Sequence, residues 1–164
     1  MKSLKLAYLA IDPGINGAAA WMTPTGQTGT APFSSPAEFL ATLSLFKAKC
    51  VGADGLMSSR DFVCLVEQVG GYTGKAQPAS SAFKFGQNFG FIIGSLMALQ
   101  IPFLTVAPTR WQKHYPVPTK SSVNYSKHKR ELRDIAAKLF PNEKVTLKNA
   151  DAFLLLHYSF TYLA

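Results

Sequence analysis

The sequence predicts an α/β protein with a five-stranded mixed sheet, three antiparallel strands followed by two parallel ones, flanked by helices. The predicted elements follow the order strand, strand, strand, helix, strand, helix, strand, helix, helix, which places helices on both faces of one sheet. The composition suits a folded chain, since 48% of the 164 residues are hydrophobic and only 16% are charged. This length fits a single domain over residues 1–164 with a sizeable core.

The first three strands are predicted at residues 4–11, 17–22 and 26–33. The first is rich in β-forming residues and ends at the turn signal Asp-Pro-Gly, residues 12–14. Short strands joined by tight turns predict an antiparallel meander.

A helix and a buried strand come next. Ser35 and Glu38 form a capping box, followed by apolar residues at helical spacing as far as Lys49. Residues 62–66 (FVCLV) are a continuous apolar run, typical of a strand buried on both faces in a parallel arrangement. Glu67 closes this strand.

A loop, a long helix and a fifth strand are predicted after Glu67. Residues 70–81 are rich in Gly, Pro and Ser, and Ser80 or Ser81 is expected to cap a helix that runs to about Leu99. The fifth strand covers residues 103–106.

The remaining chain is predicted to be mostly helical. Residues 108–115 suit a short helix, 116–125 a polar loop and 126–140 a charged amphipathic helix. Asn149 is expected to cap the last helix, which carries an apolar face. The first strand then lies at the centre of the sheet, antiparallel to the second strand and parallel to the fourth.

The charge balance favours anionic partners. Seventeen Lys and Arg residues against nine Asp and Glu residues give a net charge of +8. Residues 110–148 hold ten basic and three acidic side chains, so the excess is concentrated there. A solvated surface without a partner is the alternative explanation for such a charge run.

The cysteines and the amino-terminal segment indicate a cytoplasmic protein. Cys50 and Cys64 lack metal-binding or disulfide-framework spacing, which indicates small core residues in a reducing compartment. The first residues reach Asp12 without a cleavage site, so we expect no signal peptide, and no apolar run is long enough to span a membrane.

Three acids are predicted at the ends of elements: Asp12 after the first strand, Glu67 after the fourth, and Asp151 in the first turn of the last helix. Neighbouring parallel strands lie about 4.8 Å apart, so Asp12 and Glu67 would share one sheet edge, and the helix could bring Asp151 beside them. Clustered carboxylates repel unless hard cations such as Mg²⁺ or Mn²⁺ bind them. Taken singly, the acids have structural alternatives: a turn former, a strand end and a helix-dipole partner.

Four segments together resemble the RuvC family of Holliday junction resolvases, within the RNase H-like superfamily. They are LAIDPGINGAA (9–19), VEQVG (66–70), SSAFKFGQNFGFIIGSL (80–96) and NADAFLLLHY (149–158). The resemblance spans nearly the whole chain, and it implies an RNase H-like fold.

The resemblance implies that Asp12, Glu67 and Asp151 are catalytic acids that bind metal. They would hold two Mg²⁺ ions, for which Mn²⁺ substitutes, one orienting the attacking water and the other stabilising the leaving 3′ oxygen. The implied activity is resolution of four-way DNA junctions by paired symmetric nicks that leave 5′-phosphate and 3′-hydroxyl ends.

Two positions depart from the bacterial pattern. Lys148 stands where that pattern has a further acid or a histidine, and at three residues before Asp151 it would neutralise this carboxylate, contact the scissile phosphate, or turn to solvent. Gly70 and Gly71 replace an expected aromatic wedge, and Tyr72, which follows them, either stacks on an unpaired base or packs locally.

Basic residues would contact the phosphates of the DNA backbone, which would make the affinity for DNA depend on salt concentration. The residues expected to do so are Lys75, Lys84, Lys113, Lys120, Lys127, Lys129, Arg130 and Arg133.

The long helix carries Gly86, Gly90 and Gly94 at a spacing of four, which permits close approach of another backbone. This stripe either packs on the sheet or forms a homodimer interface, which the resemblance favours. Two other functions stay open: an RNase H-like nuclease for other branched DNA or RNA/DNA hybrids, and a junction-binding protein without turnover, for which Lys148 is the supporting feature.

Overall fold

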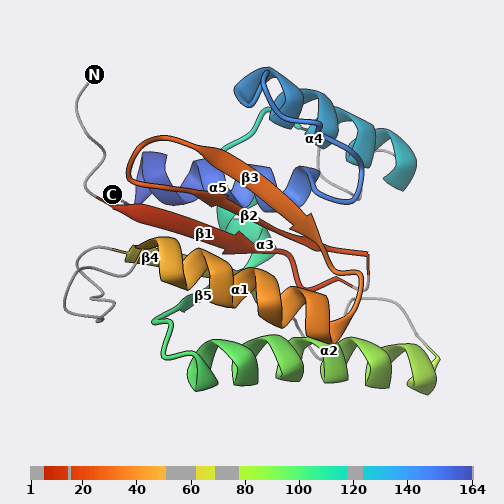
Figure 1. Ribbon diagram of the computed structural model, residues 1–164. Helices are drawn as coiled ribbons and strands as arrows, with labels where there is room; N and C mark the ends of the chain where they lie inside the picture. Colours follow the sequence, from red (N-terminus) through yellow and green to blue (C-terminus); the bar gives the residue numbers. More distant parts are fainter. Residues whose placement is uncertain (1–5, 15, 51–61, 69–77, 118–123, 164) are drawn as a thin grey trace.

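The computed structural model describes residues 6–14, 16–50, 62–68, 78–117 and 124–163. Its centre is a five-stranded sheet in the order β3-β2-β1-β4-β5, shown in Figure 1. The three amino-terminal strands are antiparallel, and β4 and β5 run parallel to β1, which confirms the predicted mixed sheet with the first strand at its centre. The strands are β1 (Ala7–Ile11), β2 (Ala18–Met22), β3 (Thr28–Pro32), β4 (Phe62–Glu67) and β5 (Leu104–Val106).

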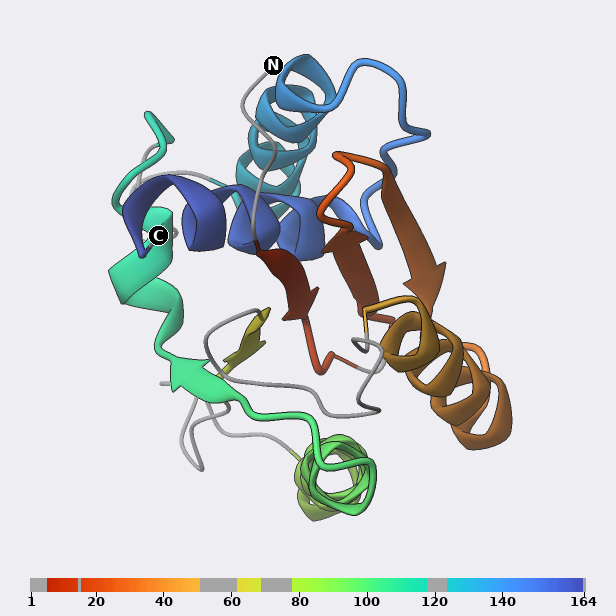
Figure 2. The same ribbon diagram turned by 60° about the vertical axis from the view of Figure 1, so that its left-hand side comes forward.

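Helices cover both faces of the sheet. Figure 2 shows α4 and α5 on one side of the sheet, and α1 and α2 on the other. The helices are α1 (Pro36–Cys50), α2 (Ala79–Ala98), α3 (Pro108–Gln112), α4 (Tyr125–Leu139) and α5 (Ala150–Tyr162).

The central strand β1 is buried along its whole length, and its side chains alternate between two cores. Tyr8 and Ala10 face a cluster that includes α5, whereas Leu9 and Ile11 face a cluster built with α1 and α2. A continuously apolar strand is what helices on both faces require.

Helix α5 is the most deeply buried helix of the described chain. Nine of its thirteen residues are buried, and it packs against β1, β2 and β4. The facing strand β2 contributes Ala18 and Ala20, whose small side chains leave room for the helix. The acid at its start is therefore fixed rigidly relative to the sheet.

The predicted helix caps are partly right. Ser35 Oγ accepts a hydrogen bond from the Glu38 amide at 3.3 Å, which confirms the cap of α1. The prediction for α2 is wrong, because that helix begins at Ala79 after Pro78 and has no side-chain cap. Asn149 precedes α5 but does not cap it either: its Oδ1 accepts from the Thr146 amide at 2.6 Å and so holds the preceding loop.

Among the described residues, no helix combines the length and the apolar character needed to cross a membrane. Cys64 is buried in the core and Cys50 is half-buried, and both are free thiols.

Candidate active site

The register of the sheet sets Asp12 and Glu67 side by side. Ile11 of β1 pairs with Val66 of the parallel strand β4, so the next residue of each strand is an acid. Asp12 still belongs to the β1 and β2 ladder through its amide, which donates to the Ala18 carbonyl at 3.0 Å. Both carboxylates consequently emerge at the same edge of the sheet.

A tight loop after β1 holds the Asp12 side chain. The Gly14 amide donates to Asp12 Oδ1 at 3.0 Å. Gly17 lies so close that a Cβ there would be 2.1 Å from the Asp12 carbonyl oxygen, so only glycine fits. From α2, Asn88 Nδ2 donates to the Pro13 carbonyl at 2.8 Å and ties the loop to that helix.

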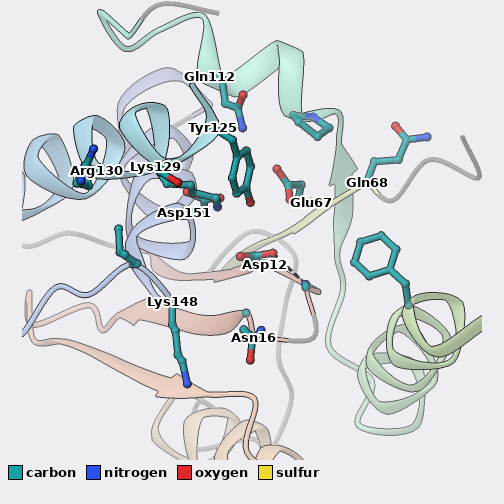
Figure 3. Close-up of a pocket in the computed structure, with 16 residues that line it drawn as sticks. Asp12, Asn16, Glu67, Gln68, Gln112, Tyr125, Lys129, Arg130, Lys148 and Asp151 are labelled. Atoms are coloured by element: carbon teal, nitrogen blue, oxygen red, sulfur yellow. Dashed lines mark hydrogen bonds and ion pairs between the residues drawn. The ribbon is translucent and has the colours of Figure 1, made fainter. Parts of the chain in front are cut away.

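The third acid, Asp151, lies in the first turn of α5 and is buried. Asp12, Glu67 and Asp151 line one cavity of about 780 Å³ (Figure 3). The three carboxylates thus come from β1, β4 and α5, elements that are far apart in the sequence.

Glu67 has an unusual environment for a carboxylate. Burial raises its pKa to about 8, and the Asp12 and Asp151 charges raise it as well. Two contributions act in the opposite direction: a hydrogen bond from Trp111 Nε1 to Glu67 Oε1 at 3.0 Å, and the charge of Lys129. Without a cation, Glu67 therefore holds its proton near neutral pH.

Trp111 is a residue of the site that the sequence reasoning did not identify. It is fully buried in α3, and its indole N–H is directed at Glu67. One general rule could have pointed to it: a buried tryptophan usually needs a hydrogen-bond acceptor for its single N–H. Trp111 lies in α3, the short helix after β5, and the last residue of β5, Val106, pairs with Glu67 at the end of β4.

A lysine from α4 neutralises Asp151. Lys129 Nζ forms an ion pair with Asp151 Oδ2, and the other carboxylate oxygen, Oδ1, is buried without a hydrogen-bond partner. Burial lowers the pKa of Lys129, but the interactions with Asp151, together with smaller contributions from Asp12 and Tyr125, outweigh this effect, so the pKa lies above its ordinary value. Lys129 was expected in the grip on the DNA backbone, and the structure places it within the cavity instead.

Lys148, in contrast, is exposed and has no ion pair with Asp151. Figure 3 shows its side chain extending away from the three carboxylates, although it lines the same cavity. Of the three alternatives for Lys148, the structure does not have the ion pair with Asp151, because the loop before α5 turns this side chain outward.

The cavity has hard oxygen donors, the ligand type that Mg²⁺ and Mn²⁺ prefer. The three carboxylates line it without meeting at one point: no three His, Cys, Asp or Glu side chains of the described residues are gathered closely enough to hold a metal ion as they stand. The buried, unpartnered Asp151 Oδ1 and the repulsion that raises the Glu67 pKa are both features that a cation would relieve. The chemistry of the donor set, hard carboxylate oxygens with one of them buried and unpartnered, therefore suits a divalent ion.

The other predicted DNA-binding residues divide into four groups. Arg130 lines the cavity, whereas Lys127, which pairs with Glu131 at 3.9 Å, and Lys113 are exposed elsewhere. Lys84 lines a second cavity, between the start of α1 and α2. Tyr72, Lys75 and Lys120 lie outside the described residues.

The glycine stripe of α2 faces away from the sheet. Among the residues that the structure describes, no atom lies within 4 Å of a Cβ built at Gly86, Gly90 or Gly94, so the alternative of close packing on the sheet is wrong. Phe83 and Met97, near the two ends of the helix, are 66% and 67% exposed.

No protein-family model and no curated protein matches the sequence. Solved structures do match: Thermus thermophilus RuvC in complex with a Holliday junction substrate, with a TM-score of 0.57 and 13% identity, and a further Thermus thermophilus RuvC structure, with a TM-score of 0.54 and 14% identity. Each match covers 96% of this chain and 95% of the other. The chain has the fold of RuvC, a mixed five-stranded sheet of the RNase H-like type flanked by helices.

Proposed function

We propose that this protein is an endonuclease dependent on a divalent metal ion that cuts branched DNA, and four-way junctions above all. The observation that carries the proposal is the convergence of Asp12, Glu67 and Asp151 on one cavity of a RuvC fold. In this proposal the three carboxylates are the catalytic acids and act as metal ligands.

Mg²⁺ is the proposed ion, with Mn²⁺ as a substitute, and when bound it supplies an activated water and stabilises charge at the phosphate. The chain's own residues define where it binds. Trp111 fixes the Glu67 carboxylate through a hydrogen bond, and the Gly14 amide fixes that of Asp12. Glu67 must lose its proton to serve as a ligand, so at neutral pH protons compete with the ion for this carboxylate.

The charge distribution supports a DNA substrate. Arg130 and Lys148 line the cavity beside the acids, and an exposed Lys127 lies on the same helix as Arg130. Such residues suit contacts to the phosphates on either side of a scissile bond. The structural neighbour that was solved with a Holliday junction substrate has the same fold, which favours a four-way junction over a linear duplex.

A homodimer is part of the proposal. The exposed face of α2 carries the apolar side chains of Phe83 and Met97 and lacks side chains at its three glycines, so a second backbone can approach closely. A dimer with two-fold symmetry would present two cavities to a substrate of similar symmetry. Paired symmetric nicks would follow, leaving 5′-phosphate and 3′-hydroxyl ends.

The test is cleavage of an end-labelled synthetic four-way junction beside a linear duplex, a flap and an RNA/DNA hybrid. Each substrate is incubated with Mg²⁺, with Mn²⁺ or with EDTA. We expect paired symmetric nicks at the junction with either metal and none in EDTA. Glu67→Gln should abolish cutting and leave junction affinity within a few fold.

Other outcomes would identify other functions. Preferential cutting of the hybrid or the flap would make the protein a different RNase H-like nuclease. Tight junction binding without cutting in either metal would favour a binding protein that lacks turnover. The ion pair between Lys129 and Asp151 is the observation that supports this second candidate, because it occupies one carboxylate oxygen of the proposed site.

A further inference from the structure

Three basic side chains line the cavity, Lys129, Arg130 and Lys148, and of these only Lys129, from α4, is largely buried. Lys129 Nζ contacts Asp151 Oδ2, with the two side chains only 21% and 9% exposed. An ion pair this deeply buried has lost most of its hydration, so breaking it leaves two uncompensated charges. The pair is therefore a persistent part of the cavity.

Lys129 also acts on the other two acids. Its charge lowers the pKa of Glu67, and the Asp12 charge in turn raises the pKa of Lys129. One ammonium group is thus electrostatically coupled to all three carboxylates. It is paired with Asp151 Oδ2, so this oxygen is not free to bind a metal ion.

The net charge of the cavity distinguishes between one and two bound metal ions. Arg130 and Lys148 are exposed, so solvent and salt screen their charges, and one divalent ion together with the largely buried Lys129 ammonium balances the three carboxylates. Two divalent ions beside the same ammonium would leave an excess of two positive charges in a largely buried site, and like charges at such short range repel strongly.

We propose that Lys129 replaces one of two cations, so that the site binds a single divalent ion through Asp12, Glu67 and Oδ1 of Asp151. Oδ2 of Asp151 stays paired with Lys129. The inference rests on the proposed function only in taking the three acids as metal ligands, and it deepens that proposal by fixing the number of ions.

The test counts Mn²⁺ ions bound to the metal-free full chain without DNA, by electron paramagnetic resonance of free Mn²⁺ and by titration calorimetry. We expect one ion per chain for the wild type and two for Lys129→Met, which keeps the length of the side chain and removes its charge. Lys129→Arg keeps the charge and should stay at one ion. Lys127→Met is the matched control, because this lysine lies outside the cavity, and it should also stay at one.

Two results would overturn the inference while the nuclease proposal stands. One is two ions in the wild type and in Lys129→Met alike, which would mean that Lys129 withdraws when metal binds. The other is a single ion in Lys129→Met when circular dichroism shows it folded. Absence of any Mn²⁺ binding by the wild type would instead refute the metal site itself, and with it both proposals.

Discussion

Replacing Glu67 by glutamine should change how the stability of the metal-free protein depends on pH. In the folded chain the pKa of Glu67 is raised from 4.5 to about 8, mainly by burial. Between these values the folded state keeps a proton that the unfolded chain has released, so the free energy of unfolding falls as pH rises. From pH 6 to pH 8 this loss amounts to roughly 2 kcal/mol. Glutamine has a similar shape and does not titrate, so the variant should not show this loss.

The measurement is urea unfolding in EDTA at pH 6 and pH 8 for the wild type, Glu67→Gln and Asp134→Asn. Asp134 is an exposed carboxylate, so its removal controls for the change in net charge. We expect the wild type and Asp134→Asn to lose about the same stability, and Glu67→Gln to lose roughly 2 kcal/mol less. Equal losses in all three proteins would show that Glu67 does not hold a proton near neutral pH, and would refute this account of the cavity.

Three further predictions concern the site and its surroundings. Trp111→Phe removes the hydrogen bond to Glu67, which costs about 0.5–1.5 kcal/mol of folding stability while this carboxyl is protonated. The change also raises the pKa of Glu67 further, so the increase of cutting rate with pH should move to higher pH. Tyr115→Phe, which removes a buried hydrogen bond away from Glu67, should leave the pH profile in place. Gly90→Trp has open space for its side chain, so light scattering should show a folded monomer, and an unchanged dimer would place the interface elsewhere. Arg130→Ala should weaken junction binding and reduce the slope of log affinity against log salt by about 1, and an unchanged slope would remove Arg130 from the phosphate contacts.

The fold was predictable because local signals in the sequence agree with one another. The apolar run at residues 62–66 predicted a strand buried on both faces, and β4 has that place between β1 and β5. The turn at residues 12–14 ended the first strand where β1 ends. Such signals depend on a few neighbouring residues, so they could be interpreted without tertiary information.

The contacts between side chains in the cavity were harder to predict from the sequence than the fold. Lys148 is three residues from Asp151 and was the natural partner by helical spacing, yet Lys129, from a different helix, forms the ion pair. Which lysine pairs with Asp151 depends on how α4 packs against α5, and no local sequence pattern predicts that packing. The caps expected from Ser80 and Asn149 failed similarly, because Pro78 already starts one helix and tertiary hydrogen bonds hold the asparagine.

The deep burial of α5 between the sheet and α4 affects when the cavity can exist during folding. Asp151 lies on the same helix that packs in the core beside β1, β2 and β4. The third acid therefore reaches the cavity only when this core has formed. A chain still being synthesised, or one cut between α4 and α5, would have Asp12 and Glu67 but neither a complete core nor a complete acid set. The proposed cutting activity would thereby depend on complete folding, and partly made or damaged copies would leave DNA intact.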